Sequence, residues 1–259
     1  MTDDSTDDSI DDSIYLRRYT FDNDTEKAFT DDLKRRKVKY LNIAFNTFSK
    51  EKQILTSLQL NLTITTINLG YCNLGSNGGI LIADILKVNR IIKSLNLSFN
   101  NIGVIGGIAI ANALSVNNTL TELQLYNNNL GSSGGFAIAN ALKYNTSLTF
   151  LELWKNNLCV LVGDAFVETF KLNYTITSLY INNNYINSDD EILINLALMR
   201  NKELHDMPYW STKRNNIFSP NFQSNIVCIL LSASKFLPTL PEELWSHHIF
   251  PHLRFSDFN

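Results

Sequence analysis

The histidines are the residues whose spacing comes nearest to a metal site. Among His205, His247, His248 and His252, the last two have the i, i+4 spacing that places two imidazoles on one helix face. Pro251 stands between them and breaks such a helix, and no cysteine lies close enough in sequence to complete a ligand set. We therefore expect no metal site.

Candidate nucleophiles are equally isolated. Cys72, Cys159 and Cys228 are odd in number and far apart, which argues against disulfides, and none has a base at a recognisable distance. The sequence contains no G-x-S-x-G motif, and its Gly-Gly pairs lack the lysine that a phosphate-binding loop needs. We expect a chain that is not an enzyme and that binds no cofactor.

Composition narrows the class of protein and its partners. With 44% hydrophobic and 18% charged residues the chain can bury a sizeable core, but no apolar run approaches the roughly 20 residues of a membrane-spanning helix. The N-terminus lacks the basic-then-apolar order of a signal peptide, so we expect a cytoplasmic protein with no membrane partner. The net charge is -3, and residues 1–13 hold six aspartates and no basic residue. The remainder is too weakly basic to bind nucleic acid.

A repeat with a period of 28 residues organises most of the chain. Its pattern is L-x-x-L-x-L-x-x-N-x-L, where L is an apolar residue and N is Asn or Cys. Period-two alternation predicts a short strand that buries residues such as Leu123 and Leu125. The repeats begin at Val38, Ile64, Ile92, Leu120, Leu148 and Ile176, with a spacing of 26 residues between the first two and of 28 between the others.

The N position comes where the chain leaves each strand and turns. We expect its side chain to face inward and to hydrogen-bond backbone groups that the turn leaves unpaired. Stacked repeats would then form an internal ladder, in which Cys72 is a buried structural thiol rather than a nucleophile. The residues at this position are Asn46, Cys72, Asn100, Asn128, Asn156 and Asn184.

After the turn each repeat switches to helical spacing. In residues 134–145 the apolar side chains Ala137, Ile138, Ala141 and Leu142 share one face. Strands lie about 4.8 Å apart whereas packed helices need about 8 to 10 Å, so the stack must curve with its strands on the concave side.

This repeat resembles the ribonuclease-inhibitor-like class of leucine-rich repeats, especially those of NOD-like receptors. The 28-residue period, the NN(I/L)G...GG link and the junction ALKYNTSLTFLEL carry the resemblance over residues 38–203. It implies an α/β fold, a right-handed β-α horseshoe of six repeats that binds proteins. Ran GTPase-activating proteins look similar, but the only arginines of the repeats, Arg90 and Arg200, lie at helix ends. Regulation of a small GTPase is therefore the weaker alternative.

The two ends of the chain depart from the repeat. We expect residues 1–20 to be a disordered acidic tail and residues 21–37 to form a helical cap on the first repeat. Residues 204–259 are predicted to be a helical C-terminal region.

Residues 240–253 of that region, LPEELWSHHIFPHL, resemble the opening helix of an F-box. The resemblance implies a substrate adaptor that contacts a Skp1-type protein of a ubiquitin ligase. Only about half the length of an F-box remains, so a cap that seals the last repeat stays open as the alternative. The residues that would make the adaptor contact are Leu240, Pro241, Leu244, Trp245, Ile249 and Phe250.

The strand positions that face outward predict a binding surface. The early strands carry small polar residues there, whereas the later three combine aromatic rings with carboxylates, which is typical of a contact with a protein or peptide. In the alternative, the rings only stack on one another to cover the strands. The predicted contact residues are Glu122, Gln124, Tyr126, Phe150, Glu152, Trp154, Tyr180 and Asn182.

The adaptor hypothesis makes one biochemical prediction. A Skp1-type protein should co-purify with the full chain and should be lost when residues 238–259 are deleted, because the F-box-like segment would make the contact. Affinity purification with mass spectrometry measures both. Absence of any such protein from the intact chain contradicts the adaptor hypothesis.

Overall fold

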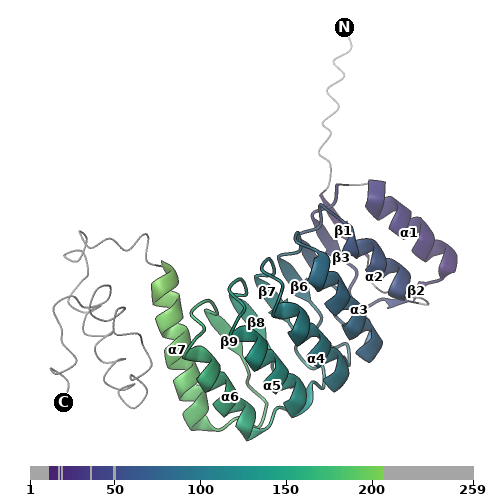
Figure 1. Cartoon of the computed structure of the whole chain (residues 1–259). Coiled ribbons are helices and arrows are strands. Elements are labelled where there is room, and N and C mark those ends of the chain that lie inside the picture. The colour runs from purple at the N-terminus through teal and green to yellow at the C-terminus, as the bar shows by residue number, and fades with distance from the viewer. Residues whose placement is uncertain (1–11, 17, 19, 36, 49–50, 207–259) are drawn as a thin grey trace, which may run out of the picture.

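A computed structural model describes residues 12–16, 18, 20–35, 37–48 and 51–206 (Figure 1). Seven strands form one parallel sheet in the order β1-β3-β5-β6-β7-β8-β9. Their bounds are β1 (Ser13–Tyr15), β3 (Tyr40–Asn42), β5 (Thr66–Asn68), β6 (Ser94–Asn96), β7 (Glu122–Gln124), β8 (Phe150–Glu152) and β9 (Ser178–Tyr180). A second parallel pair joins β2 (Thr20–Phe21) to β4 (Thr47–Phe48).

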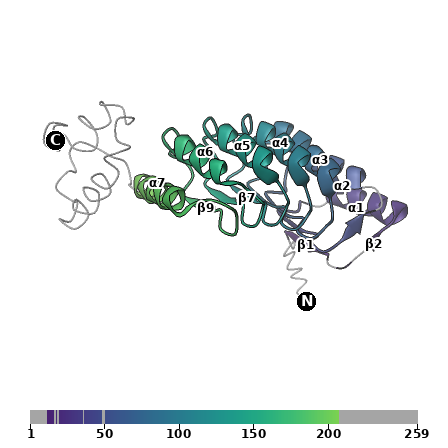
Figure 2. The ribbon, with the colours of Figure 1, turned by 90° about the horizontal axis from the view of Figure 1, so that it is seen from below.

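Helices alternate with the strands and cover one side of the sheet. They are α1 (Asn23–Arg35), α2 (Glu51–Gln59), α3 (Gly75–Val88), α4 (Gly103–Leu114), α5 (Gly131–Leu142), α6 (Val160–Phe170) and α7 (Ser188–Asp206). Figure 2 shows α2 to α6 in one row with the strands on the opposite side. The structure is the predicted right-handed leucine-rich-repeat horseshoe, with helices on its convex side.

The register of the sheet stacks equivalent residues of successive repeats. Leu95 pairs with Leu123, Leu123 with Leu151, and Leu151 with Leu179. All four side chains are buried in one continuous core. The helices approach closely at the Gly-Gly pairs, since a Cβ on Gly79 would lie 2.9 Å from the Cα of Gly106 in the next helix.

The predicted internal asparagine ladder is present. The buried Asn128 donates through Nδ2 to the carbonyl of Leu97 at 2.8 Å. Its Oδ1 accepts from the backbone amides of Asn100 at 3.1 Å and Ile102 at 3.2 Å, in the turn of the preceding repeat. One asparagine side chain thus supplies hydrogen-bond partners to backbone groups of the preceding repeat. Asn100, Asn156 and Asn184 bond in the same way.

A second asparagine ladder, which we did not predict, runs along the other ends of the strands. Asn117 donates to the carbonyls of Leu86 and Asn89, and its Oδ1 accepts from the amides of Thr119 and Leu120. It therefore closes the turn between each helix and the following strand. The residues of this second ladder recur every 28 positions at Asn61, Asn89, Asn117, Asn145, Asn173 and Asn201.

The expectation that residues 1–20 are disordered is wrong for the part that the structure describes. Ile14 is buried in β1, which pairs with β3, and Asp12 forms a 2.7 Å ion pair with Lys39. Asn46 donates to the carbonyl of Leu16 as later ladder asparagines do to their preceding repeats. The strand was missed because the aspartates obscure a three-residue apolar alternation. Residues 1–11 lie outside the described residues.

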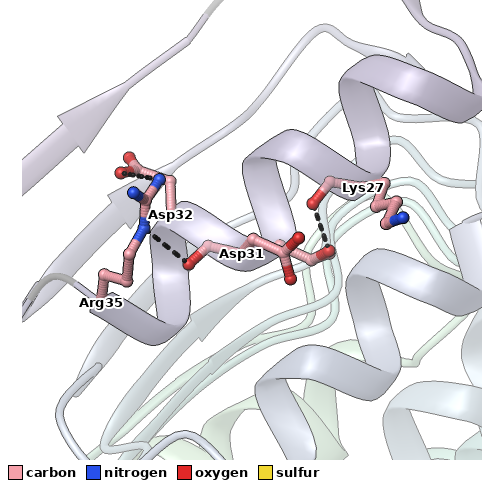
Figure 3. A network of polar contacts seen from close by, with 5 residues as sticks. Lys27, Asp31, Asp32 and Arg35 are labelled. Carbon is pink, nitrogen blue, oxygen red and sulfur yellow. Dashed lines mark hydrogen bonds and ion pairs between the residues drawn. The ribbon is translucent and has the colours of Figure 1, made fainter.

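Helix α1 lies within residues 21–37, where we predicted a cap, and ends the row of helices (Figure 1). It buries Leu33 and brings Phe29 against Phe21, with ring centroids 5.3 Å apart. Figure 3 shows polar contacts along this helix, where Arg35 lies 3.6 Å from the Asp32 carboxylate. Of the predicted C-terminal region only residues 204–206, the end of α7, belong to the described part.

The ladder makes a prediction about stability. Asn128→Ala should lower the free energy of unfolding by about 3 kcal/mol, because the amides of Asn100 and Ile102 lose their acceptor inside the protein. Asn112→Ala is the matched control, since Asn112 is exposed on α4 and alanine there changes stability by about 0.5 kcal/mol or less. Urea unfolding measures both, and equal stabilities of the two variants would contradict the role of the ladder.

Candidate functional site

The sheet register brings the predicted contact residues of the concave face together. Gln124 pairs with Glu152, and Glu152 with Tyr180, so these three form one row across β7, β8 and β9. Phe150 lies in the neighbouring row between Glu122 and Ser178.

Two pairs of aromatic rings lie on either side of Glu152 along β8. Tyr126 stacks on Trp154 with ring centroids 5.0 Å apart and an interplanar angle of 18°. Phe150 contacts Tyr180 at 5.5 Å in a tilted arrangement. The rings do stack on one another, as the alternative interpretation held, but 38% of Trp154 and 48% of Tyr180 stay exposed. They therefore remain accessible to a partner.

The two carboxylates of this surface differ in environment. Glu122 is exposed and accepts a hydrogen bond from the Ser94 hydroxyl at 2.8 Å. Glu152 is half-buried, and its burial raises the pKa of its carboxyl above the ordinary value for glutamate. No hydrogen bond or ion pair joins the Glu152 carboxylate to any residue that the structure describes. Asn182, the last of the predicted contact residues, is exposed just beyond β9.

Three aromatic residues that we did not predict extend this surface toward the N-terminus. Phe45 stacks on Tyr71 at 4.3 Å, Tyr71 on Phe99 at 4.0 Å, and Phe99 meets the Tyr126 ring edge-on at 4.5 Å. Together with Tyr126 and Trp154 they form a continuous line of five rings, which we call the aromatic row. Phe45 and Tyr71 are 38% and 44% exposed.

The backbone under the aromatic row is unusual. Phe45, Tyr71 and Phe99 adopt positive φ angles of 58° to 59°, which are unfavourable for bulky residues by roughly 1–2 kcal/mol each. Equivalent positions in later repeats hold Lys155 and also Asn127 and Asn183, the last two being of a residue type that tolerates this conformation. The turn itself therefore does not require aromatic residues. Ring stacking, worth about 0.5–1.5 kcal/mol a pair, offsets part of the backbone cost.

The sequence does contain a signal for these three residues. They stand one position before the ladder residues Asn46, Cys72 and Asn100, where the first three repeats all carry an aromatic side chain. The pattern of outward strand positions does not include them, because these residues belong to the turns.

The structure also bears on the chemistry of the cysteines. Cys72 is buried, its thiol donates to the carbonyl of Ile43 at 3.2 Å, and desolvation raises its pKa to about 11. Cys159 is partly exposed, and a hydrogen bond with Ser132 lowers the pKa of its thiol.

Within residues 12–206, apart from the few that are not described, no three His, Cys, Asp or Glu side chains converge as metal ligands. Among the described helices none is long and apolar enough to cross a membrane.

Comparison with known proteins agrees with the repeat. Residues 60–83, 88–111 and 116–139 each match the Leucine Rich repeat family. The tropomodulin C-terminal domain of Caenorhabditis elegans aligns with 58% of this chain and 92% of its own, at 13% identity and a TM-score of 0.53. Actin-binding site 2 of leiomodin-1 aligns with 60% of this chain and 73% of its own, at 26% identity and a TM-score of 0.42. No curated protein matches the chain in sequence.

The cysteines give a prediction for thiol chemistry. In a Cys228→Ser background at pH 8, iodoacetamide should modify Cys159 and spare Cys72. A pKa of about 11 leaves roughly one Cys72 thiol in a thousand as the reactive thiolate at that pH. Mass spectrometry of peptides measures the two rates. Cys72 should react only after urea unfolding, and rapid native modification that survives Cys159→Ser would contradict its burial.

Proposed function

We propose that this chain is a non-catalytic scaffold for protein–protein interaction, which binds a partner protein or peptide on its concave face. The contact core would consist of the rings of Tyr126, Phe150, Trp154 and Tyr180 with the carboxylate of Glu152. We also propose that the repeats are of the ribonuclease-inhibitor-like class and that the protein is cytoplasmic. Glu122, Gln124 and Asn182 would complete the contact.

One observation carries this proposal: the partly exposed aromatic row and the ring pair Phe150–Tyr180 lie beside two carboxylates on the same surface. Aromatic anchors with a few charged groups at their side are the usual composition of an interface hot spot. Seven strands at about 4.8 Å also give a face of roughly 29 Å, long enough for an extended peptide or a protein interface of standard size.

Fewer observations support the two other functions, a ubiquitin-ligase adaptor and a regulator of a small GTPase. The residues of the adaptor hypothesis, from Leu240 to Phe250, lie outside the described residues, so that role remains a hypothesis from sequence. For GTPase regulation, Arg90 donates to carbonyls at the end of its own helix, and Arg200 donates to those of Phe170 and Asn173. Arginines engaged in this way favour a structural role over contact with a GTPase.

The proposal predicts which substitutions abolish binding. Trp154→Ala and Tyr180→Ala should remove partners captured by the full chain, since each deletes an exposed anchor worth about 2 kcal/mol or more. Affinity purification with quantitative mass spectrometry measures the loss.

The matched control is Tyr144→Ala, which deletes an exposed tyrosine, 75% accessible, just beyond the end of α5 on the helical side of the horseshoe. This variant should retain the same partners. If Trp154→Ala and Tyr180→Ala leave every captured partner unchanged, the placement of the binding site is wrong.

A further inference from the structure

Glu152 occupies the centre of the aromatic part of the concave face. Phe150, the first residue of β8, and Trp154, two residues beyond the end of that strand, flank it at the i-2 and i+2 positions, and alternate residues of an extended chain point to the same side. Their partners Tyr180 and Tyr126 belong to the neighbouring repeats on opposite sides. A carboxylate is therefore set among four aromatic rings.

Partial burial destabilises the ionised form of the Glu152 carboxylate, and no contact in the described structure compensates for this. Half-burial removes water from the charged group, and no described residue gives it a hydrogen bond or an ion pair. By contrast, its counterpart Glu122 is exposed and bonded to Ser94. An opposite charge from outside the chain can pair with the Glu152 carboxylate without first breaking an internal ion pair.

The described strand positions of this face carry charge of one sign, whereas the turn after Trp154 holds the exposed Lys155. Among the described outward positions of the seven strands, the ionised side chains are Glu122 and Glu152, both acidic. Aromatic faces attract cations, and long basic side chains can lay their methylene stems along apolar surface while the head reaches a carboxylate. The acidic segment of residues 1–13 has the wrong charge to fill this site.

We propose that Glu152 and the rings around it accept a single arginine or lysine side chain from an extended segment of the partner protein. This inference deepens the proposed function and rests on it. The inference therefore predicts that the partner segment contains a basic residue near apolar residues. An acidic or phosphorylated segment would be repelled from the same surface.

The rest of the face suits an extended backbone. Asn68 and Asn96 each accept a hydrogen bond through Oδ1 from the amide two residues further along, at Gly70 and Ser98. Their Nδ2 groups donate to no residue in the part of the chain that the structure describes. These free donors lie side by side on paired strands and can bind backbone carbonyls of a segment that runs across the sheet. The aromatic row follows alongside and offers apolar contact to its side chains.

A peptide titration tests the inference on the full chain. The probe is a Leu-Ser-Arg-Ser-Leu peptide with blocked ends, and the matched probes carry citrulline or glutamate in place of arginine. The readout is the NMR shift of the Trp154 indole N–H, assigned with Trp154→Phe. The arginine peptide should shift this signal, and citrulline, which keeps the shape but not the charge, should bind about tenfold more weakly or worse.

Substitutions then test whether the arginine of the peptide binds Glu152. Glu152→Gln should weaken the arginine peptide by about tenfold or more and leave the citrulline peptide unchanged. The control Glu168→Gln removes an exposed carboxylate of α6, which pairs with Lys171, and should leave both peptides unchanged. Equal binding of arginine and citrulline, no effect of Glu152→Gln, or no response of Trp154 to the arginine peptide would each overturn the inference.

The stability of the Glu152→Gln variant distinguishes a binding role of Glu152 from a structural role. Because burial penalises the ionised carboxylate at pH 7, Glu152→Gln should unfold at the same urea concentration as the parent or a higher one, whereas a structural carboxylate would lower that midpoint. The outcome also stays distinct from a failure of the proposed function. If partner capture depends on Trp154 but no peptide shows charge preference, the concave site stands and only the basic anchor is wrong.

Discussion

The hydrogen bonds of the buried asparagines are the constraint on which the rest of the structure depends. A chain that turns twice in every 28 residues leaves backbone amides and carbonyls that must find partners inside the protein. Asn128 and Asn117 supply those partners at the two ends of the strands, and each bonds to the preceding repeat as well as to its own. The spacing of the repeats is therefore fixed by hydrogen bonds, and the leucines that lie between the ladders fill the core.

An interior satisfied in this way leaves the outward side chains free to vary. The same turn tolerates Phe45, Tyr71 and Phe99 in early repeats and Asn127 in a later one, although a positive φ is unfavourable for the aromatic residues. Likewise, the paired strands hold asparagines on β5 and β6 but Glu152 on β8. Differences of this kind, on a uniform scaffold, are where a binding preference can be encoded.

The sequence predicts the structural role of a residue best where the residue recurs with the 28-residue period and belongs to a known motif. The core leucines and the ladder through Asn128 follow that period with a known motif, so both the fold and the outward positions of Gln124, Glu152 and Tyr180 were predicted. The second ladder obeys the same period, but the motif assigns no role to Asn117. Strand β1 could not be predicted, because three residues beside an acidic run gain their stability from pairing with β3 and from the burial of Ile14, which are both long-range contacts. Glu152 is partly buried in a sheet that brings four rings from three repeats near it, and no local pattern encodes that.

Hydrogen exchange at the turn of a single repeat tests the ladder most directly. The amides of Asn100 and Ile102 donate to the Oδ1 of Asn128, whereas the amide of Asn101 between them donates to no described residue. In the intact protein, NMR should therefore find Asn100 and Ile102 protected by roughly a hundredfold or more over Asn101. Rapid exchange at all three amides would contradict the claim that the asparagines hold the repeats together.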